Sequence, residues 1–351
     1  MKIIVSAGGT GGHIYPALSI MNALIKRGIN KEDILYIGTL DRMEKDIIPK
    51  EGFNYIGLDI KGLDRKNLFK NFKVMGLFIK AYFKASKIIK DFKPDLVLGI
   101  GGYITLPVLL AAQNKGIKTF IHEQNAIPGL ANKIISKRAS LIGVSFEESL
   151  KYFKKNAYLS GNPVSEEAYN AEKLDKRSLF NDDKKIVLIV MGSLGSMTVN
   201  EELIKMMPNL SKRYNYIIVT GKKYFHLFKE ESNIKVLPYI NNMKEYLKTV
   251  DLIVSRAGAT TIAEITAAGL PSILVPSPYV THNHQELNAR SLEKQGASFV
   301  LLEKDFNADN LNKQIEDILE DEALYISMVD SCHSFFKKDA ASDIADKLLN
   351  L

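Results

Sequence analysis

The chain has 351 residues, 46% of them hydrophobic, which is enough to bury two cores of ordinary size rather than one. Its single cysteine, Cys332, excludes an internal disulfide and is typical of a reducing compartment, so we expect a cytoplasmic protein. The formal net charge of +7 favours acidic partners, either phosphorylated ligands, an anionic membrane surface or nucleic acid, although solvated lysines explain it equally well.

The N-terminal residues do not predict a signal peptide, and the uncharged runs do not predict a membrane-spanning segment. Met1 and Lys2 lead directly into IIVSA, so we expect no signal peptide. Two uncharged runs, residues 96–114 and 265–285, are interrupted by glycines and prolines. They are better explained as pieces of strand, loop and helix.

Four times along the chain an apolar run ends in glycines and then becomes helix-like. The four are KIIVSA into GGTGGH (2–13), DLVLGI into GGYITLP (95–107), KIVLIV into MGSLGS (185–196) and DLIVSR into AGATT (251–261). This alternation is typical of parallel sheets with crossover helices, which bind ligands at the carboxyl ends of the strands. Two units fall in each half, so we predict two Rossmann-like α/β domains, 1–161 and 162–334, followed by a short amphipathic helix in 335–351.

The glycine loops indicate phosphate binding. A backbone without side chains brings its N–H groups close to phosphate oxygens, and the helix that follows adds its positive end. Residues 8–12 lack the Lys-Ser/Thr of a P-loop and an in-register GxGxxG, so neither ATP hydrolysis nor simple dinucleotide binding is supported. Glycines needed only for tight turns remain the alternative for any single loop.

His13 lies at the mouth of the first loop, three residues before Pro16, where we expect the first turn of the next helix. In a catalytic role, an imidazole at this position has a pKa suited to taking a proton from a substrate hydroxyl. In the alternative, structural role, His13 caps the turn or forms a hydrogen bond to it.

Glu264 in SRAGATTIAEITAAGLP allows two interpretations. Thr261 and Glu264 have the spacing of a capping box, in which the carboxylate only ties the start of the helix. An acid just after a glycine-bearing turn also accepts both hydroxyls of a ribose, as in dinucleotide sites, and we favour this second interpretation.

An ordered set of motifs carries a resemblance to a known family. The motifs are GGTGGHIYPAL (8–18), DRME (41–44), GIGGY (99–103), HEQN (122–125), GNPV (161–164), SRAGATTIAEITAAGLPSILVP (255–276) and HQELNA (284–289). Together they resemble glycosyltransferase family 28, the bacterial N-acetylglucosaminyltransferases that convert lipid I to lipid II. The resemblance covers nearly the whole chain in the right order.

The resemblance implies a GT-B fold, with two Rossmann-like domains facing each other across a deep cleft. The N-terminal domain would take lipid I and face the membrane, the C-terminal domain would bind UDP-GlcNAc, and the last helix would cross back to the N-terminal domain. The implied reaction is inverting transfer of GlcNAc to the C4 hydroxyl of MurNAc, forming lipid II and UDP in peptidoglycan synthesis. It also implies a peripheral protein on the cytoplasmic face of the plasma membrane, with other cell-wall synthesis proteins as further partners.

The resemblance also implies roles for individual residues. Glu264 would bind the ribose, and the backbone of Ile240, near Met243, would face uracil. The remaining donor contacts would come from Thr10, Gly11, Gly12, Asn125, Ser165, Ser193, Gly258, Ala259, Thr260, Gln285 and Asn288. The acceptor diphosphate would meet Gly9, Gly11, Gly101, Gly102 and Tyr103.

Two positions depart from the family pattern. The usual GNPVR appears as GNPVS, so that Ser165 replaces a cation beside the donor phosphates, and GGSQGA appears as MGSLGS with Leu194. These departures put the local phosphate contacts in doubt.

Transfer needs a base for the acceptor hydroxyl and charge stabilisation on the departing UDP. His13 is the preferred base, with His122 and Glu123 as alternatives. No DxD-like acidic pair is present, and His282 and His284 have no convincing third ligand, so we expect no bound metal and no other cofactor.

The segment 66–93 explains part of the positive charge. Phe72, Met75, Ile79 and Phe83 recur at helical spacing, and Lys73, Lys80 and Lys84 fall mostly beside them. Basic residues next to exposed aromatics suit an anionic membrane surface, whereas an ordinary packed helix with solvated lysines is the alternative.

Other functions are less well supported by the sequence. A UDP-GlcNAc 2-epimerase has a similar fold and the same nucleotide sugar but needs no lipid acceptor. No RNP-like, KH or finger pattern supports nucleic acid, so we expect no nucleic-acid partner, and the missing GxGxxG disfavours an NAD-dependent oxidoreductase. A catalytically silent binding module remains a further alternative.

Overall fold

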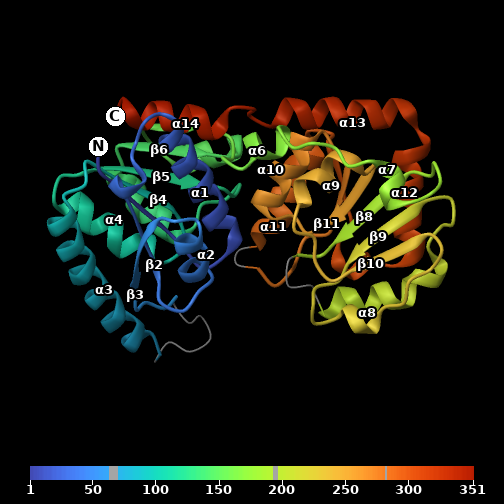
Figure 1. Cartoon of the computed structure of the whole chain (residues 1–351), viewed down its shortest axis with the longest axis horizontal. Helices are drawn as coiled ribbons and strands as arrows, with labels where there is room; N and C mark the ends of the chain where they lie inside the picture. Colours follow the sequence, from blue (N-terminus) through green and yellow to red (C-terminus); the bar gives the residue numbers. More distant parts are fainter. Residues whose placement is uncertain (63–69, 193–196, 281–282) are drawn as a thin grey trace. The chain divides into compact units, whose positions relative to one another are not determined.

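The computed structural model describes residues 1–62, 70–192, 197–280 and 283–351, which divide into two compact units (Figure 1). The first unit is Met1–Val164 with Asp339–Leu351, and the second is Ser165–Lys338. The chain leaves the first unit within the range 161–164 that the sequence indicates, but it returns after Lys338 rather than at residue 335. Helix α13 (Glu322–Phe335) extends to residue 335, and the next residue, Phe336, still stacks on Tyr169 of the second unit.

The first unit is a parallel sheet covered by helices. Among its described residues, seven strands lie in the order β3-β2-β1-β4-β5-β6-β7. The strands are β1 (Ile3–Ala7), β2 (Ile34–Thr39), β3 (Asn54–Leu58), β4 (Leu96–Gly101), β5 (Lys118–Glu123), β6 (Leu141–Val144) and β7 (Ala157–Leu159). The helices are α1 (Gly11–Lys26), α2 (Glu44–Lys50), α3 (Lys70–Phe92), α4 (Thr105–Asn114), α5 (Leu130–Ile135) and α14 (Ala340–Leu349).

The second unit repeats this plan. Its described residues form six parallel strands in the order β10-β9-β8-β11-β12-β13. The strands are β8 (Ile186–Val190), β9 (Asn215–Val219), β10 (Ile234–Leu237), β11 (Leu252–Ser255), β12 (Ser272–Leu274) and β13 (Ser298–Val300). The helices besides α13 are α6 (Ser165–Tyr169), α7 (Lys176–Leu179), α8 (Met197–Met206), α9 (Met243–Thr249), α10 (Ala259–Ala268), α11 (His284–Lys294) and α12 (Ala308–Glu320).

In each unit the first strand lies in the middle of the sheet. Strand β1 pairs with both β2 and β4, and β8 pairs with both β9 and β11. A parallel strand covered on both faces must be apolar throughout, which explains the continuous runs IIVSA and IVLIV. The glycine loops therefore leave the carboxyl ends of central strands, where such folds bind ligands.

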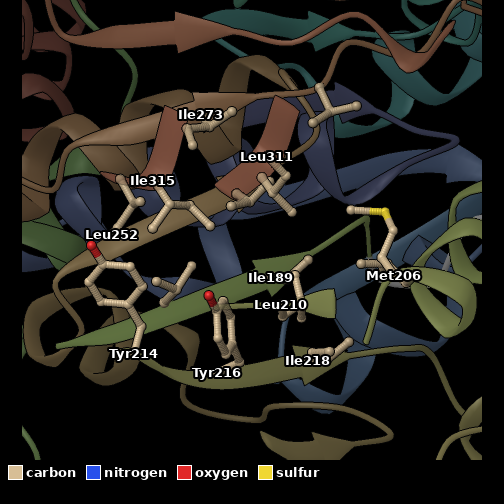
Figure 2. Packing of buried hydrophobic residues seen from close by; sticks show 14 of the residues in the cluster. Ile189, Met206, Leu210, Tyr214, Tyr216, Ile218, Leu252, Ile273, Leu311 and Ile315 are labelled. Atoms are coloured by element: carbon tan, nitrogen blue, oxygen red, sulfur yellow. The ribbon is translucent and has the colours of Figure 1, made fainter. Parts of the chain in front are cut away.

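The core of the second unit is closed by α12 (Figure 2). Leu311, Ile315 and Ile318 recur at helical spacing and are buried against the sheet. The Asn307 side chain caps this helix by accepting the N–H of Asn310 at 2.9 Å.

The last helix, α14, belongs to the first unit, where it packs beside α1 (Figure 1). Ile344 and Leu348 are buried in the core that α1 and β1 share. At the surface, Arg27 Nη2 donates to Asp346 Oδ2 at 2.7 Å, and this hydrogen bond, together with the charge of Arg27, lowers the pKa of Asp346.

Candidate active site

The first glycine loop leads from β1 directly into α1. Gly9 has φ +94°, Thr10 is the N-cap, and α1 begins at Gly11, so His13 is the third residue of the helix. The expectation that the helix begins near Pro16 is wrong, because Pro16 lies one turn further inside it. The structure thus places His13 on the first turn, where its backbone N–H donates to the Thr10 carbonyl at 3.1 Å.

The His13 ring is held by the loop that precedes it. Its Nδ1 lies 3.1 Å from the carbonyl oxygen of Gly8, with the Thr10 hydroxyl 3.4 Å away. Because a carbonyl oxygen only accepts, Nδ1 carries the hydrogen of the neutral ring, and Nε2 carries the lone pair. This is the tautomer that a general base acting through Nε2 requires, and the side chain is half-buried.

The second glycine loop packs directly on the first. Gly8 N–H donates to the Gly101 carbonyl at 3.3 Å, and Gly101 and Gly102 have φ +118° and +90°. A Cβ on Gly101 would lie 2.5 Å from His13 Cδ2, and one on Gly102 would lie 2.5 Å from the Gly8 oxygen. These glycines are required for the close approach of two loops around His13. Tyr103 follows them and packs half-buried against the sheet.

Glu44 belongs to the DRME motif, but no role for it was predicted from the sequence. The residue begins α2 and has no exposed surface. Its Oε2 accepts the N–H of Gly9 at 3.2 Å, and its Oε1 accepts the N–H and hydroxyl of Thr39 at 3.0 and 2.7 Å. A buried acid beside a glycine loop indicates a structural or functional role, but the DRME motif alone does not show that its acid is buried.

His122, an alternative base in the sequence analysis, is held inside the first unit. The ring is fully buried; Nε2 lies 2.9 Å from the Gly161 carbonyl, and the Gln124 side-chain amide donates to Nδ1 at 3.0 Å. Both nitrogens are thus engaged. Burial lowers the pKa of His122 to about 4, although the hydrogen bond to Gly161 raises it. His122 is a neutral structural residue that joins the end of β5 to Gly161, close to the point where the chain leaves the first unit.

Glu123, the other alternative base, is likewise engaged by the protein. Its buried carboxylate accepts the backbone and side-chain N–H groups of Asn125 at 3.0 and 3.2 Å. It also accepts the backbone N–H of Gly129 at 3.0 Å and the amide of Asn132 at 2.9 Å. With two donors on each oxygen, the carboxylate shapes the loop that carries Asn125.

In the second unit, Glu264 lies inside α10 rather than at its cap. The helix begins at Ala259 with Gly258 as N-cap, so Thr261 is its third residue and Glu264 its sixth. The capping-box interpretation is therefore wrong. Burial raises the pKa of Glu264 from 4.5 to about 7, with Lys244 lowering it and Glu167 raising it. A half-buried acid with a raised pKa is characteristic of functional sites.

Several expected donor residues hold the loops around α10. The Asn288 side chain is fully buried and donates to the Ala257 carbonyl at 3.3 Å, while Gln285 Oε1 accepts the N–H of Ser277 at 2.9 Å. Both lie on α11 and fix neighbouring loops. Ile240 is buried just before α9, and Met243 is the first residue of that helix and is half-buried.

Sequence reasoning also missed Arg256 and Glu303. Arg256 Nη2 lies 2.6 Å from Glu303 Oε2, and its Nη1 donates to the Val275 carbonyl at 3.1 Å. The other Glu303 oxygen accepts the hydroxyl of Thr198, near the start of α8, at 3.0 Å. This largely buried pair links the end of β11 to α8.

The comparisons with known proteins show the family of the chain. The N-terminal domain of glycosyltransferase family 28 matches residues 3–144, and its C-terminal domain matches residues 186–344. The chain belongs to glycosyltransferase family 28. It is an α/β hexosyltransferase with two Rossmann-like domains, as the sequence predicted.

Relatives match over almost the full length. The chain is 45% identical to the UDP-N-acetylglucosamine--N-acetylmuramyl-(pentapeptide) pyrophosphoryl-undecaprenol N-acetylglucosamine transferase of Caldicellulosiruptor saccharolyticus, over 98% of this chain and 96% of the relative. It is 43% identical to the protein of the same name from Bacillus licheniformis, over 100% of this chain and 99% of that one.

Solved structures agree in fold. MurG of Acinetobacter baumannii has a TM-score of 0.82 and 27% identity, with 100% of this chain and 99% of that chain covered. A putative UDP-N-acetylglucosamine 2-epimerase from Listeria monocytogenes has a TM-score of 0.71 over 99% and 96% of the two chains, but at 13% identity the likeness concerns the fold alone.

Of the two departures from the family-28 pattern, the structure describes the one at Ser165 but not the one at Leu194. Ser165 is buried, and its hydroxyl donates to the Lys337 carbonyl at 2.8 Å, so it ties together the two segments by which the chain enters and leaves the second unit. Ser193 and Leu194 lie outside the described residues, and so does His282.

For α3 the sequence predicts a stripe of apolar and aromatic side chains at the surface. The α3 stripe comprises Phe72, Met75, Ile79 and Phe83, with exposed fractions of 80%, 54%, 49% and 66%. The opposite side of the helix, with Ala81, Ala85 and Ile89, is buried in the core. The stripe is therefore not the packing face of the helix.

The lysines beside the stripe divide into two kinds. Lys73, Lys80 and Lys84 are all exposed. Of these, Lys84 Nζ also donates to the Gly57 carbonyl at 3.0 Å, at the edge of the sheet. Across the residues that the structure describes, no helix combines the length and the apolar content needed to cross a membrane. The described residues also hold no group of three or more His, Cys, Asp or Glu arranged as a metal site.

Proposed function

We propose that this protein transfers GlcNAc from UDP-GlcNAc to the C4 hydroxyl of the MurNAc of lipid I, with release of UDP. The observation that carries the proposal is the position of His13, whose Nδ1 is bonded to Gly8 so that Nε2 is the proton-accepting nitrogen. Identity of 40–45% over nearly all of the chain to transferases named for these substrates supports it.

In this reaction the acceptor oxygen attacks the anomeric carbon of GlcNAc while the bond from that carbon to the UDP oxygen breaks. The hydroxyl proton passes to His13 Nε2, and the configuration at the anomeric carbon inverts. The two bonds of the ring to its own loop fix it against rotation, which keeps the base aligned during transfer. The neighbouring Gly101, Gly102 and Tyr103, together with Gly9 and Gly11, are proposed to meet the acceptor diphosphate through backbone N–H groups.

The second unit is proposed to bind the donor. The Glu264 carboxylate would accept the ribose hydroxyls, and the backbone near Ile240 would face uracil. The positive end of α10 at Gly258, Ala259 and Thr260 would stabilise the charge that develops on the departing diphosphate. Asn288 and Gln285 act by fixing the loops that surround this helix end.

We also propose that transfer requires no bound metal, since backbone N–H groups and a helix end can take the charge that Mg²⁺ takes in other transferases. The measurement is transfer in the presence of a chelator. Activity that disappears with chelator and returns with Mg²⁺ would overturn this part of the proposal.

The α3 stripe is proposed to lie on an anionic membrane, with Lys73 and Lys80 at the headgroups, which brings the enzyme to its lipid-linked acceptor on the cytoplasmic face. Flotation with anionic and with neutral liposomes at low salt tests this. Equal binding to both would remove the electrostatic part.

The test of the main proposal is transfer of labelled GlcNAc to a lipid I analogue, with UDP release measured in parallel. We expect UDP release to depend on the lipid. UDP release without lipid, accompanied by epimerised sugar, would instead favour the 2-epimerase.

A further inference from the structure

Glu44 is a buried carboxylate that the reaction as described does not use. Its side chain has no exposed surface, and its two oxygens accept three hydrogen bonds, from Gly9 N–H, Thr39 N–H and the Thr39 hydroxyl. Burying an acid is unfavourable unless its oxygens are satisfied by donors, so this arrangement is specific to a carboxylate.

The surrounding backbone is shaped to admit this side chain. A Cβ on Gly8 would lie 2.6 Å from Glu44 Oε1, and a Cβ on Gly38 would lie 2.8 Å from Glu44 Cγ. The Glu44 side chain therefore packs against Gly8 and Gly38, at positions where a larger residue would collide with it. Glu44 joins the end of β2 to the loop that follows β1.

The bond from Glu44 to Gly9 leads directly to His13. Gly9 follows Gly8, whose carbonyl accepts the Nδ1 hydrogen of His13, and Gly8 N–H is bonded in turn to Gly101. Gly9 has φ +94°, and glycine has little intrinsic preference for one orientation of the Gly8–Gly9 peptide there. The Glu44 carboxylate, which accepts the Gly9 N–H, therefore fixes the orientation of this peptide.

We propose that Glu44 is a positioning residue that holds the Gly8–Gly9 peptide, so that the Gly8 carbonyl keeps His13 in its Nδ1–H form. Its effect on catalysis rests on the proposed function, in which His13 Nε2 accepts the acceptor proton. Glu44 itself touches neither substrate.

The test compares Glu44→Gln with Asp95→Asn. In the first variant, whichever way the amide turns, its NH2 group faces the N–H of either Gly9 or Thr39. The control removes a carboxylate that accepts the backbone N–H of Lys2 at 2.7 Å, just before β1 and therefore at the opposite end of that strand from Gly9. Two quantities are measured in each protein: the tautomer of His13 by ¹⁵N NMR, assigned with His13→Ala, and kcat and KM for transfer.

We expect Glu44→Gln to lower kcat by about 10- to 100-fold with the donor KM changed by less than about twofold, because the base is displaced while the second unit is intact. The His13 resonances should move from a single Nδ1–H form toward a mixture. Asp95→Asn should leave both unchanged. If Glu44→Gln does not fold, Thr39→Val weakens the same carboxylate from its other oxygen and should lower kcat by a few-fold with a smaller change in the His13 resonances.

Two results would overturn the proposal: an unchanged tautomer in a folded Glu44→Gln protein, or an equal loss of kcat in Asp95→Asn. A shifted tautomer with normal kcat would support the positioning role and overturn instead the assignment of His13 as the base. The two proposals therefore fail separately.

Discussion

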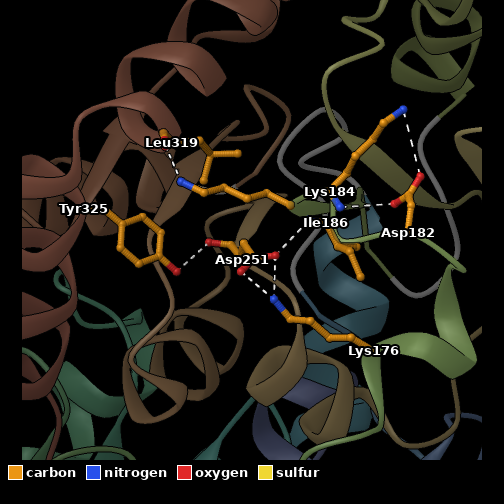
Figure 3. A network of polar contacts seen from close by, with 8 residues as sticks. Lys176, Asp182, Lys184, Ile186, Asp251, Leu319 and Tyr325 are labelled. Carbon is orange, nitrogen blue, oxygen red and sulfur yellow. Dashed lines mark hydrogen bonds and ion pairs between the residues drawn. The ribbon is translucent and has the colours of Figure 1, made fainter.

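The two units use the same device at the amino ends of their central strands. In the first, Asp95 precedes β4 and accepts the N–H of Lys2, just before β1. In the second, Asp251 precedes β11 and accepts the N–H of Ile186, the first residue of β8, at 2.8 Å, and it also accepts Lys176 at 2.7 and 2.9 Å (Figure 3). In both units the aspartate joins the first and fourth strands.

At the carboxyl ends the units differ. The first unit brings three glycines with positive φ, Gly9, Gly101 and Gly102, around a histidine of fixed tautomer. The second presents the start of α10 and a half-buried acid, Glu264, one and a half turns inside that helix. A shared frame thus supports different chemistry, and the residues at the strand ends decide which. The predictions below separate the two ends and the two units.

The largest expected effect is on the first unit's chemistry. His13→Ala should lower kcat by about 10²- to 10⁴-fold, which is the usual contribution of a positioned general base, with little change in UDP-GlcNAc affinity. Transfer kinetics and calorimetric titration with UDP-GlcNAc measure the two quantities. A parallel loss of donor binding would mean that His13 belongs to donor recognition rather than proton transfer.

The corresponding change in the second unit should affect binding. Glu264→Gln should raise the donor KM by about 10- to 100-fold, because hydrogen bonds from ribose hydroxyls to a charged carboxylate are worth about 1.5–3 kcal/mol. Its kcat should fall much less than that of His13→Ala. If kcat falls as far as in His13→Ala and KM does not change, the division of labour between the units is wrong.

The raised pKa of Glu264 gives a pH dependence to the same site. In the folded protein the Glu264 carboxyl has a pKa of about 7. Below that pH the carboxyl must therefore lose its proton before it can accept hydrogen bonds from both ribose hydroxyls. We therefore expect affinity for UDP-GlcNAc to rise by about tenfold per pH unit up to about pH 7 and to level off above it. Titrations at pH 5.5 to 8.5 check this, and Glu264→Gln should remove the slope; a slope that persists in this variant belongs to another group.

A pair of glycine substitutions compares the loops themselves. Gly101→Ala places a Cβ 2.5 Å from His13 Cδ2 at φ +118°, so we expect a loss of about 1–3 kcal/mol in stability and a lower kcat. Gly258→Ala meets nothing closer than the Thr261 hydroxyl at 3.5 Å and has extended backbone, so its cost should be about 1 kcal/mol or less. Thermal unfolding and transfer assays distinguish the two, and equal costs would argue against the close packing of the first unit's loops.

The sequence predicted the frame because parallel strands buried on both faces are continuous apolar runs, and the glycines marked their carboxyl ends. It predicted where His13 lies but not its tautomer, which depends on a carbonyl 3.1 Å away. It missed Glu44 because the bond to Gly9 spans 35 residues, and it did not show that His122 is buried because burial of the end of β5 is a tertiary property. The helix start at Gly11 was also missed, because glycine has low helix propensity and contacts with the second loop override it.

The smallest expected effect concerns the shared device at the amino ends. Asp251→Asn removes an ion pair with Lys176 at a mostly buried position, and Tyr325 donates to the backbone carbonyl of the same residue at 3.1 Å. We expect it to cost the second unit about 1–2 kcal/mol. Asp95→Asn, with one bond at an exposed site, should cost the first unit about 0.5 kcal/mol. Because two units need not unfold together, urea titrations followed by hydrogen exchange should assign each loss to its own unit. If both variants destabilise the same unit, or if Asp95→Asn costs more, then the strand-joining aspartates are not equivalent devices, and the resemblance between the units ends with the order of their strands.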